Sequence, residues 1–332
     1  MKKLVIKDKM KRDPVILLKG LTKRYEDLVA VDHISFHVQE GEIFGLLGPN
    51  GSGKTTTIRM LVGLARPTEG HAIILGRDNL SGMVETKKLI GVVPDISNLY
   101  DDLSARENLL FMAKLYGVPR SQREERADDL LKAFGLFERK DDKFGTFSRG
   151  MKRALTIAAA LMHEPRILFL DEPTVGLDVV AARSLRNLIS NLHHQGLTII
   201  LTTHYLEEAD QLCNRLAILV KGRIVGIDTP EGLKRQAGGR PTIEVRFSGK
   251  ISDLLDELSK RLKDSEVHLL ERNRVRIFGD DPKKVLTEVF HFSEDKGLEL
   301  EAINSIMPSL EDAFVRITGL SPTIMKSEKG GK

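Results

Sequence analysis

The sequence lacks several features that would assign it to large classes of protein. Its single cysteine, Cys213, excludes an internal disulfide and a cysteine-ligated metal site, and it favours a reducing compartment. No apolar run approaches the ~18 residues that a membrane-spanning helix needs. The N-terminal stretch MKKLVIKDKMKRDP is basic but has no apolar core, so we expect no signal peptide.

The composition is that of a globular protein of more than one domain. The chain has 332 residues, of which 41% are hydrophobic and 30% are charged, and this length suggests two or three domains. The formal net charge is +4, which is small and spread along the chain. A net charge this small is typical of charged side chains exposed to solvent and does not indicate nucleic-acid binding. We therefore expect no nucleic-acid partner.

The most informative stretch is GLLGPNGSGKTTTIRML at residues 45–61. An apolar run predicts a buried strand, a glycine-rich loop follows, and apolar residues at helical spacing then predict a helix. This is the context of the phosphate-binding pattern G-x-x-x-x-G-K-[ST]. The fixed positions of that pattern are Gly48, Gly53, Lys54 and Thr55.

The residue types of this loop suit a polyphosphate. Glycines let the backbone bend so that its N–H groups face the phosphates, and the helix that follows adds its positive end. Lys54 would reach the β- and γ-phosphates, and the hydroxyl of Thr55 would ligate Mg²⁺. The other residues predicted to contact the nucleotide are Pro49, Asn50, Gly51, Ser52 and Thr56.

Two acidic residues follow a second apolar strand. The stretch RILFLDEP delivers Asp171 and Glu172 to a strand end, where parallel sheets bind their ligands. One carboxylate can hold the Mg²⁺ shell, and the other can take a proton from an attacking water. A pair of solvated acids is the alternative, but it fits poorly after so apolar a strand.

Three further positions admit both a functional and a structural interpretation. His204 ends the apolar strand LTTH, where it would reach the γ-phosphate or serve only as a structural residue. Ser148 precedes a long helix, where it is a helix cap or the start of a second anion-binding helix for another copy's nucleotide. The pair His193-His194 is not expected to bind metal, because adjacent helix residues do not share a face.

The hydrophobic pattern also predicts the domain organisation. Short antiparallel strands precede the phosphate loop, helices fill residues 104–160, and strands at 166–171 and 198–204 flank a helix, which implies a parallel sheet. After a linker at 236–241, strands and helices alternate in the order βαββαβ, which predicts a ferredoxin-like domain. The expected domains are residues 14–235, with a helical subdomain at about 95–160, and residues 242–319, while 1–13 and 320–332 are polar tails.

Taken together, these motifs resemble the ATP-binding subunit of ATP-binding-cassette (ABC) transporters. The phosphate loop, FSRGM at 147–151, ILFLDEP at 167–173, VGLD at 175–178 and His204 occur in the order of that family. The resemblance covers residues 14–235 and implies an α/β fold: a P-loop, RecA-like ABC ATPase core with an antiparallel β subdomain and a helical subdomain. The family signature is usually Leu-Ser-Gly-Gly-Gln, so FSRGM departs from it while keeping the serine and the second glycine.

The resemblance also assigns roles to residues outside the phosphate loop. Tyr25 would stack on adenine, unless it only packs in the antiparallel sheet. Ser148 and Gly150 would contact the γ-phosphate across a head-to-tail dimer of cassettes, and Asp178 would link the two sites. Asp95 stands where the family usually has glutamine; it would either contact the Mg²⁺ shell and relay the nucleotide state, or cap the turn that follows it.

The function implied is that of an ATPase that powers export. TPEGLK at 229–234 and PSLEDAFVRITG at 308–319 are similar to the daunorubicin-resistance branch, which works with multispan permeases of the ABC-2 type. The cofactors would be ATP and Mg²⁺. The working form would be a homodimer or heterodimer of cassettes, and it would lie at the cytoplasmic face of the membrane. A soluble ABC ATPase with a regulatory or nucleic-acid-linked role is the alternative; the single phosphate loop and the absence of a heptad run favour transport.

Overall fold

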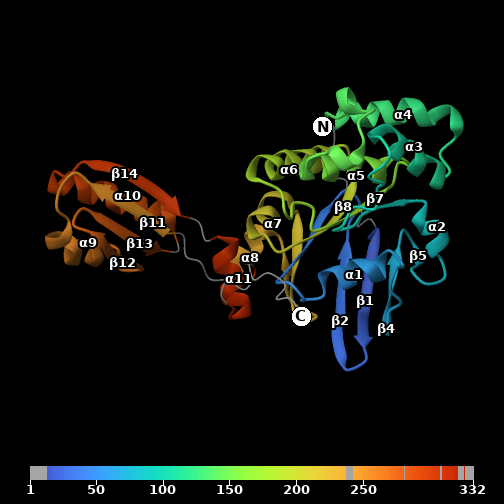
Figure 1. Ribbon diagram of the computed structural model, residues 1–332. Coiled ribbons are helices and arrows are strands. Elements are labelled where there is room, and N and C mark those ends of the chain that lie inside the picture. The colour runs from blue at the N-terminus through green and yellow to red at the C-terminus, as the bar shows by residue number, and fades with distance from the viewer. Residues whose placement is uncertain (1–12, 237–241, 280, 307–308, 321–324, 326–332) are drawn as a thin grey trace, which may run out of the picture. The chain divides into compact units, whose positions relative to one another are not determined.

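The computed structural model describes residues 13–236, 242–279, 281–306, 309–320 and 325 (Figure 1). Most of both predicted tails and residues 237–241 of the predicted linker lie outside these residues. The chain divides into two compact units, with the division between Pro230 and Glu231.

A six-stranded sheet forms the centre of the first unit, in the order β10-β9-β3-β8-β7-β6. The neighbouring pairs are parallel except for β9 with β10, which form a hairpin over Lys221 and Gly222. Every residue of β3, β7 and β8 is buried, as expected of parallel strands covered on both faces. The strands are β3 (Ile43–Leu47), β6 (Ile90–Val93), β7 (Ile167–Asp171), β8 (Thr198–Thr203), β9 (Arg215–Val220) and β10 (Arg223–Asp228).

A second, antiparallel sheet has the order β2-β1-β4-β5 and confirms the predicted β subdomain. Helix α1 (Lys54–Leu61) contributes Ile58 to a core cluster that includes residues of both sheets. Phe36 of β2 stacks on Phe44 of β3, with ring centroids 4.8 Å apart. The strands are β1 (Ile16–Tyr25), β2 (Leu28–Val38), β4 (Glu69–Ile74) and β5 (Arg77–Asp78).

The helical subdomain is built from α3, α4 and α5, which share one apolar cluster. Helix α3 begins at a capping box, in which Ser104 and Glu107 satisfy each other's backbone N–H groups. Helix α6 lies beside α5 (Figure 1), and α7 follows β8. The helices are α2 (Met83–Lys87), α3 (Ala105–Leu115), α4 (Arg120–Ala133), α5 (Arg149–Leu161), α6 (Val179–His194) and α7 (Leu206–Leu212).

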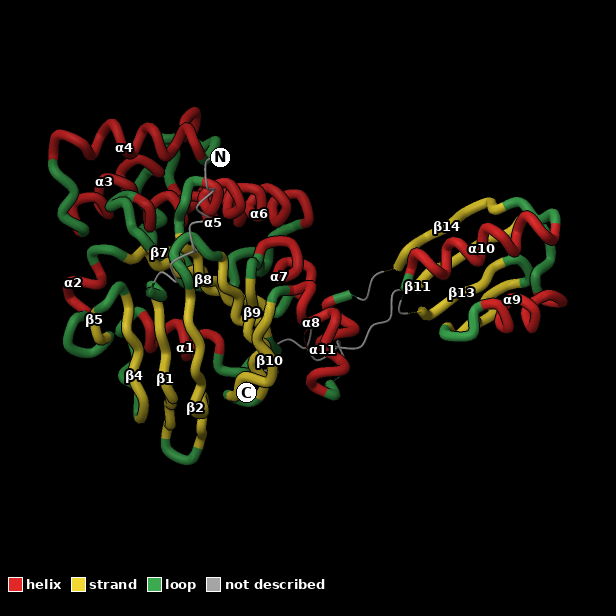
Figure 2. Tube along the Cα trace, turned by 180° about the vertical axis from the view of Figure 1, so that it is seen from behind, coloured by secondary structure: helices red, strands yellow, loops and turns green. Residues whose placement is uncertain are grey.

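The second unit contains the predicted ferredoxin-like arrangement. Its strands pair antiparallel in the order β12-β13-β11-β14, and helices α9 and α10 cover one face of the sheet (Figure 2). The elements are β11 (Thr242–Phe247), α9 (Leu255–Arg261), β12 (Ser265–Glu271), β13 (Arg274–Gly279), α10 (Pro282–Lys296) and β14 (Leu300–Ile306). Two more helices, α8 (Pro230–Gln236) and α11 (Leu310–Thr318), flank them in the sequence.

Helix α10 offers a matched pair of phenylalanines that tests whether this unit has its own core. Phe292 is 0% exposed and meets Phe247 edge-on, whereas Phe290 is 49% exposed on the same helix. We expect Phe292→Ala to lower the free energy of unfolding of the second unit by ~3–5 kcal/mol, because it leaves a cavity. Phe290→Ala should change it by less than ~0.5 kcal/mol.

Hydrogen exchange of the full chain measures both effects. In the Phe292→Ala variant the amides of β11 and β13 should lose protection while those of β3 and β8 keep it. Equal effects of the two substitutions, or lost protection in β3, would contradict an independent core.

Candidate active site

The loop at residues 48–53 follows β3 and is held close to neighbouring strands. A Cβ atom on Gly48 would lie 2.2 Å from the carbonyl oxygen of Leu219, and one on Gly53 would lie 2.6 Å from that of Ala30. Gly53 also has φ 104° and stands at the N-cap of α1, where no side chain caps the helix. Glycine is therefore required at both positions, and the N–H groups at the start of α1 face the loop.

Lys54 turns its ammonium group back over this loop. Its Nζ donates hydrogen bonds to the carbonyl oxygens of Gly48 at 2.7 Å and Pro49 at 3.1 Å. The same Nζ lies 3.1 Å from Oε1 of Glu172, and both side chains are largely buried. The positive charge of the loop is thereby brought to the strand-end carboxylate.

Asp171 lies at the end of β7 between two hydroxyl groups. Its Oδ1 accepts hydrogen bonds from Thr202 Oγ1 at 2.6 Å and Thr55 Oγ1 at 3.1 Å. Burial raises the pKa of Asp171, and the two hydroxyls partly offset that effect. A threonine hydroxyl beside a carboxylate is a hard oxygen donor set that fits Mg²⁺, although the described residues contain no cluster of His, Cys, Asp or Glu sufficient for a metal by itself.

Glu172 is held by two basic side chains. Its Oε2 lies 2.8 Å from Nδ1 of His204, and its Oε1 contacts Lys54. Burial raises the pKa of Glu172, but the hydrogen bond with His204 and the ammonium of Lys54 outweigh it, so that the pKa is lowered overall. The carboxylate is therefore ionised at neutral pH and has the charge that a general base needs.

The backbone of Glu172 is unusual for a residue with a side chain. Its φ of 48° lies in the left-handed region, which favours glycine and costs free energy at other residues. The N–H of Glu172 donates to the carbonyl oxygen of Thr202 at 3.2 Å and to its Oγ1 at 2.9 Å. The end of β8 thus holds this conformation and fixes the direction of the carboxylate.

Comparison with known proteins assigns the family. The family described as ABC transporter matches residues 31–175. The chain is 37% identical over 302 residues to the linearmycin resistance ATP-binding protein LnrL of Bacillus subtilis, covering 90% of this chain and 97% of that protein. It is 38% identical over 297 residues to the Nod factor export ATP-binding protein I of Burkholderia thailandensis, covering 90% and 94%.

This chain belongs to the ABC transporter ATP-binding proteins. A solved ATP-binding subunit of an ABC transporter superposes with a TM-score of 0.61 at 32% identity, covering 68% of this chain and 93% of that one. A component of an ABC transporter complex from Clostridium perfringens gives a TM-score of 0.63 at 25% identity, covering 76% and 97%. The predicted family, fold and ATPase activity coupled to transport are confirmed.

ABC ATP-binding subunits bind ATP, dimerise and work with membrane permeases. In the described parts of this ABC subunit, no helix combines the length and the apolar character that a membrane crossing requires. The phosphate loop and the ends of β7 and β8 meet at one edge of the central sheet, and their contact with ATP stays a prediction.

Two residues predicted to act across a dimer, Ser148 of the signature and Asp178 of the VGLD segment, cap helices in this ABC protein. Ser148 is the N-cap of α5, and its Oγ accepts a hydrogen bond from the N–H of Met151 at 3.3 Å. Asp178 caps α6 in the same way through the N–H of Ala181 at 2.8 Å. The capping role of Ser148 is thus present, and contact with a nucleotide across a dimer stays a prediction for Ser148, Gly150 and Asp178.

Within the part of the chain that the structure describes, the side chains of Tyr25 and Asp95 make no hydrogen bond with Glu172, Lys54 or His204. Tyr25 ends β1 with its ring half exposed, and the ammonium of Lys23 lies 4.8 Å from the ring centroid. The Asp95 side chain is exposed and accepts no hydrogen bond from any residue that the structure describes, so the turn-capping alternative finds no support there. Its role at the Mg²⁺ shell stays a prediction.

Sequence reasoning missed three residues that the fold brings to this ABC site or close to it. Thr202 hydrogen-bonds both Asp171 and Glu172, and its place two residues before His204 was the available signal. Arg153 is buried in α5, where an arginine among the apolar residues of the signature helix was the signal. Buried Glu208 in α7 was also missed; burial raises its pKa, and the hydroxyls of Thr203 and Thr174 partly lower it.

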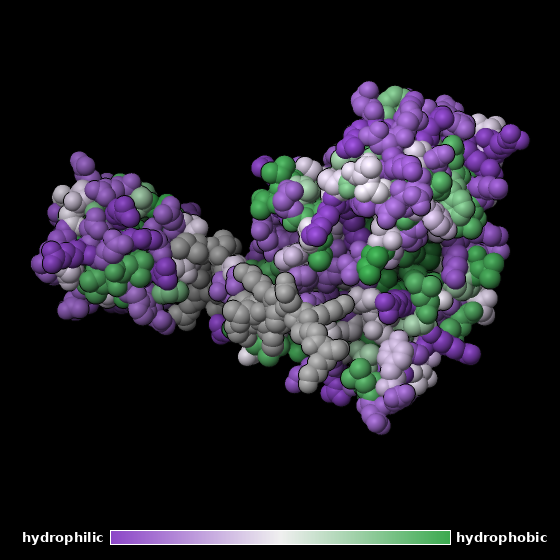
Figure 3. All heavy atoms as spheres, in the orientation of Figure 1, coloured by the Kyte–Doolittle hydropathy of each residue, from purple (hydrophilic) through white to green (hydrophobic). Residues whose placement is uncertain are grey.

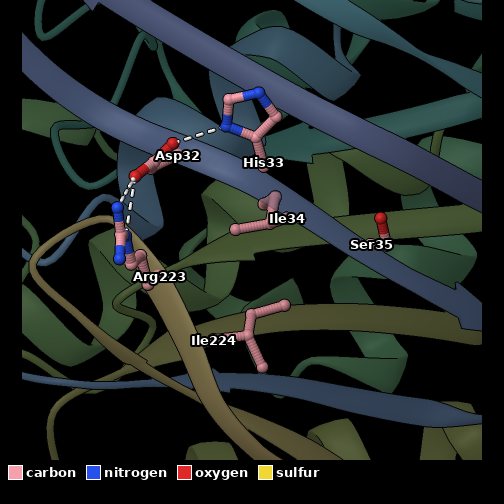
Figure 4. Close-up of a pocket in the computed structure, with 6 residues that line it drawn as sticks. All are labelled: Asp32, His33, Ile34, Ser35, Arg223 and Ile224. Atoms are coloured by element: carbon pink, nitrogen blue, oxygen red, sulfur yellow. Dashed lines mark hydrogen bonds and ion pairs between the residues drawn. The ribbon is translucent and has the colours of Figure 1, made fainter.

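A separate hollow of about 440 Å³ opens between β2 and β10 (Figure 4). The carboxylate of Asp32 lies there 2.6 Å from Nδ1 of His33 and 2.7 Å from the guanidinium of Arg223. No phosphate-loop residue, and neither Asp171 nor Glu172, lines this hollow. The charged groups that line it are already paired with one another, and we assign it no role in ATP hydrolysis.

Two threonines of β8 separate a catalytic effect from a stability effect. Thr202→Val removes the hydroxyl from Asp171 and Glu172, while Thr198→Val removes the one that accepts from the N–H of Gly41 at 2.9 Å. Each substitution should lower the free energy of unfolding by ~1–3 kcal/mol, because a buried polar group loses its partner. Only Thr202→Val should lower kcat, by about tenfold, or ~1.4 kcal/mol of barrier.

The measurements are thermal unfolding and steady-state ATP hydrolysis of both variants. Equal kcat values in the two variants would show that the hydroxyl of Thr202 contributes to packing and not to the arrangement of the carboxylates.

Proposed function

We propose that this chain hydrolyses ATP with Glu172 as the general base and thereby powers an exporter with an ABC-2-type permease. The observation that carries the proposal is the position of the Glu172 carboxylate between Lys54 and His204, on three segments that meet at one edge of the sheet. The relatives named for linearmycin resistance and Nod factor export support the direction of transport.

The proposed reaction assigns one task to each side chain. Lys54 and the N–H groups of residues 48–55 bind the β- and γ-phosphates of ATP, and the phosphate oxygens take the place that Glu172 has beside Lys54. Glu172 then accepts a proton from water while the water oxygen attacks the γ-phosphorus and the bond to ADP breaks. His204, hydrogen-bonded to Glu172, keeps the carboxylate directed at that water.

Mg²⁺ is the metal proposed for this site. Thr55 and Asp171 would hold it, and the ion would neutralise charge on the phosphate oxygens during transfer. Asp95 is proposed to contact the hydration shell of the ion, because the carboxyl groups of Asp95 and Asp171 are close enough to influence each other. Tyr25 is proposed to stack on the adenine ring.

The working form is proposed to be a head-to-tail dimer of cassettes. Exposed valines surround the cap of α6: Val175, Val179 and Val180. The guanidinium of Arg149, next to Ser148, reaches the carbonyl oxygen of Gly176 at 3.4 Å, so the signature and the VGLD segment lie together. A second copy would cover these apolar side chains and receive Ser148 and Gly150 at the γ-phosphate of its nucleotide.

The helical subdomain is proposed to contact the permease. Four large apolar side chains are exposed there: Ile96, Tyr100, Phe111 and Leu115. Tyr100 and Phe111 meet edge-on with centroids 5.2 Å apart, whereas hydrophilic residues dominate the surface over α4 (Figures 1 and 3). Through this contact the chain would attach peripherally to the inner face of the cell membrane.

Replacing the proposed base tests the mechanism. Glu172→Gln should keep ATP binding and lower turnover by about 10²–10⁴-fold, because an amide cannot accept the proton. Unhydrolysed ATP should then hold two copies together in size-exclusion chromatography with ATP and Mg²⁺. Glu207→Gln, an exposed glutamate of α7, is the control that should hydrolyse ATP as the parent does. Parental turnover in Glu172→Gln would remove Glu172 from the role.

Two equally exposed leucines test the permease contact. Leu115 is 67% exposed in the helical subdomain, and Leu64 is 70% exposed after α1. Burial of a leucine contributes ~1.5–3 kcal/mol, so Leu115→Ser should weaken permease binding by about ten- to a hundredfold. The basal ATPase rate should not change, and Leu64→Ser should change neither quantity.

The rates are measured with the purified subunit alone and with its permease in proteoliposomes. A Leu115→Ser variant that the permease still stimulates fully would place the contact elsewhere.

A further inference from the structure

The guanidinium of Arg153 binds backbone carbonyl groups from three segments. Its Nε donates to the oxygen of Pro173 at 3.0 Å, and its NH2 group donates to that of Asp171 at 2.5 Å. Its NH1 group donates to the oxygens of Pro94 and of Asp95, the latter at 3.3 Å. Only arginine carries five N–H donors in a planar fork that can serve four acceptors at once.

Two of these carbonyls flank Glu172 on either side. Residue 172 has the left-handed φ of 48°, so its backbone needs support from its surroundings. Thr202 supplies that support at the N–H of Glu172, and Arg153 supplies it at the carbonyl oxygens of the preceding residue, Asp171, and the following residue, Pro173. The direction of the carboxylate therefore depends on both residues.

Arg153 also lies on the helix that Ser148 begins. A helix moves as a rigid body over so few residues, and therefore a shift at Ser148 displaces the guanidinium. The loop at 94–95, which leads into the helical subdomain, is tied to the same group. The signature helix, this loop and the end of β7 are thus joined through one side chain.

We propose that Arg153 is a positioning residue, which ties the backbone of Glu172 to the signature helix and to the loop at 94–95. The inference rests on the proposed function, since it requires Glu172 to be the base. When Ser148 contacts the nucleotide of a second copy, that contact fixes the position of α5. The hydrogen bonds of Arg153 then fix the carbonyl groups on either side of Glu172. Each copy's catalytic carboxylate thereby depends on the nucleotide bound across the dimer.

The surroundings of Arg153 fit this role better than a purely structural one. Burial lowers its pKa, while the carboxylates of Asp95, Asp171, Glu208 and Glu172 oppose that effect, so the charge lies within reach of the catalytic acids. Yet its hydrogen-bond acceptors in the described residues are all backbone oxygens. An arginine that served only to neutralise charge would be expected to bind a carboxylate directly.

Arg153→Lys is the principal test, with Arg153→Gln as a second variant and Arg166→Lys as the control. Lysine keeps the charge but cannot serve four carbonyls, and a small displacement of a catalytic group can cost about a hundredfold in rate. We expect kcat to fall by about ten- to a hundredfold in Arg153→Lys and further in Arg153→Gln, with KM for ATP within about threefold. Arg166 directly precedes β7, the strand that ends at Asp171, and it pairs with Glu40 at the surface. Its replacement by lysine should change neither kcat nor KM.

A double-mutant cycle shows whether Arg153 acts through Glu172. Single-turnover hydrolysis of Arg153→Lys, Glu172→Gln and the double variant should be strongly non-additive, with the double variant no slower than Glu172→Gln alone. Binding of a fluorescent ATP analogue and thermal unfolding are measured on the same samples. The proposal would be overturned if the two substitutions lower the rate additively, or if Arg153→Lys keeps the parental kcat. It would also be overturned if the fall in rate is accounted for by weaker nucleotide binding or by a lower unfolding temperature.

The failure of this inference is distinguishable from failure of the proposed function. If Glu172→Gln alone retains parental turnover, the base is misassigned. If Glu172→Gln is inactive while Arg153→Lys hydrolyses ATP at the parental rate, the base stands and the positioning role falls.

Discussion

The rest of the site depends on one buried carboxylate held between two basic groups. An ionised Glu172 in the interior would be costly without partners, and Lys54 and His204 supply them from different segments. Satisfying this charge requires the phosphate loop, β7 and β8 to end at the same edge of the sheet. The order β3-β8-β7 in a parallel sheet meets that requirement, because the carboxyl ends of parallel strands lie together.

Around this carboxylate, a set of hydrogen bonds to the backbone and to Asp171 fixes the direction of the Glu172 side chain. Thr202 holds the N–H of Glu172 and the carboxylate of Asp171, and Arg153 holds the neighbouring carbonyls. These contacts stabilise a left-handed backbone that a glutamate would not adopt by itself. The strain lies at the residue to which we assign proton transfer, where a fixed orientation has the greatest effect on rate.

Much of this site could be predicted from local sequence. The strand–loop–helix around Lys54 and the strand ending in Asp171 and Glu172 each lie within one short segment, so periodicity and residue type suffice. The sequence marks Thr202 and Arg153 as unusual positions, but it does not predict their roles, because each role depends on contacts with segments 18 to 59 residues away in the chain. The predicted helices and strands did not include the four-residue β6 or the five-residue α2, which are too short to show a clear period.

The most direct test of the central claim is the ionisation of Glu172 itself. Carbon-13 NMR of glutamate-labelled protein, with Glu172→Gln to assign the signal, follows its carboxyl group against pH. Since the pKa is lowered from its usual 4.5, the carboxyl shift should stay constant from pH 8 downward and move only below 4.5. A carboxyl group that titrates near neutral pH would contradict an ionised base held by Lys54 and His204.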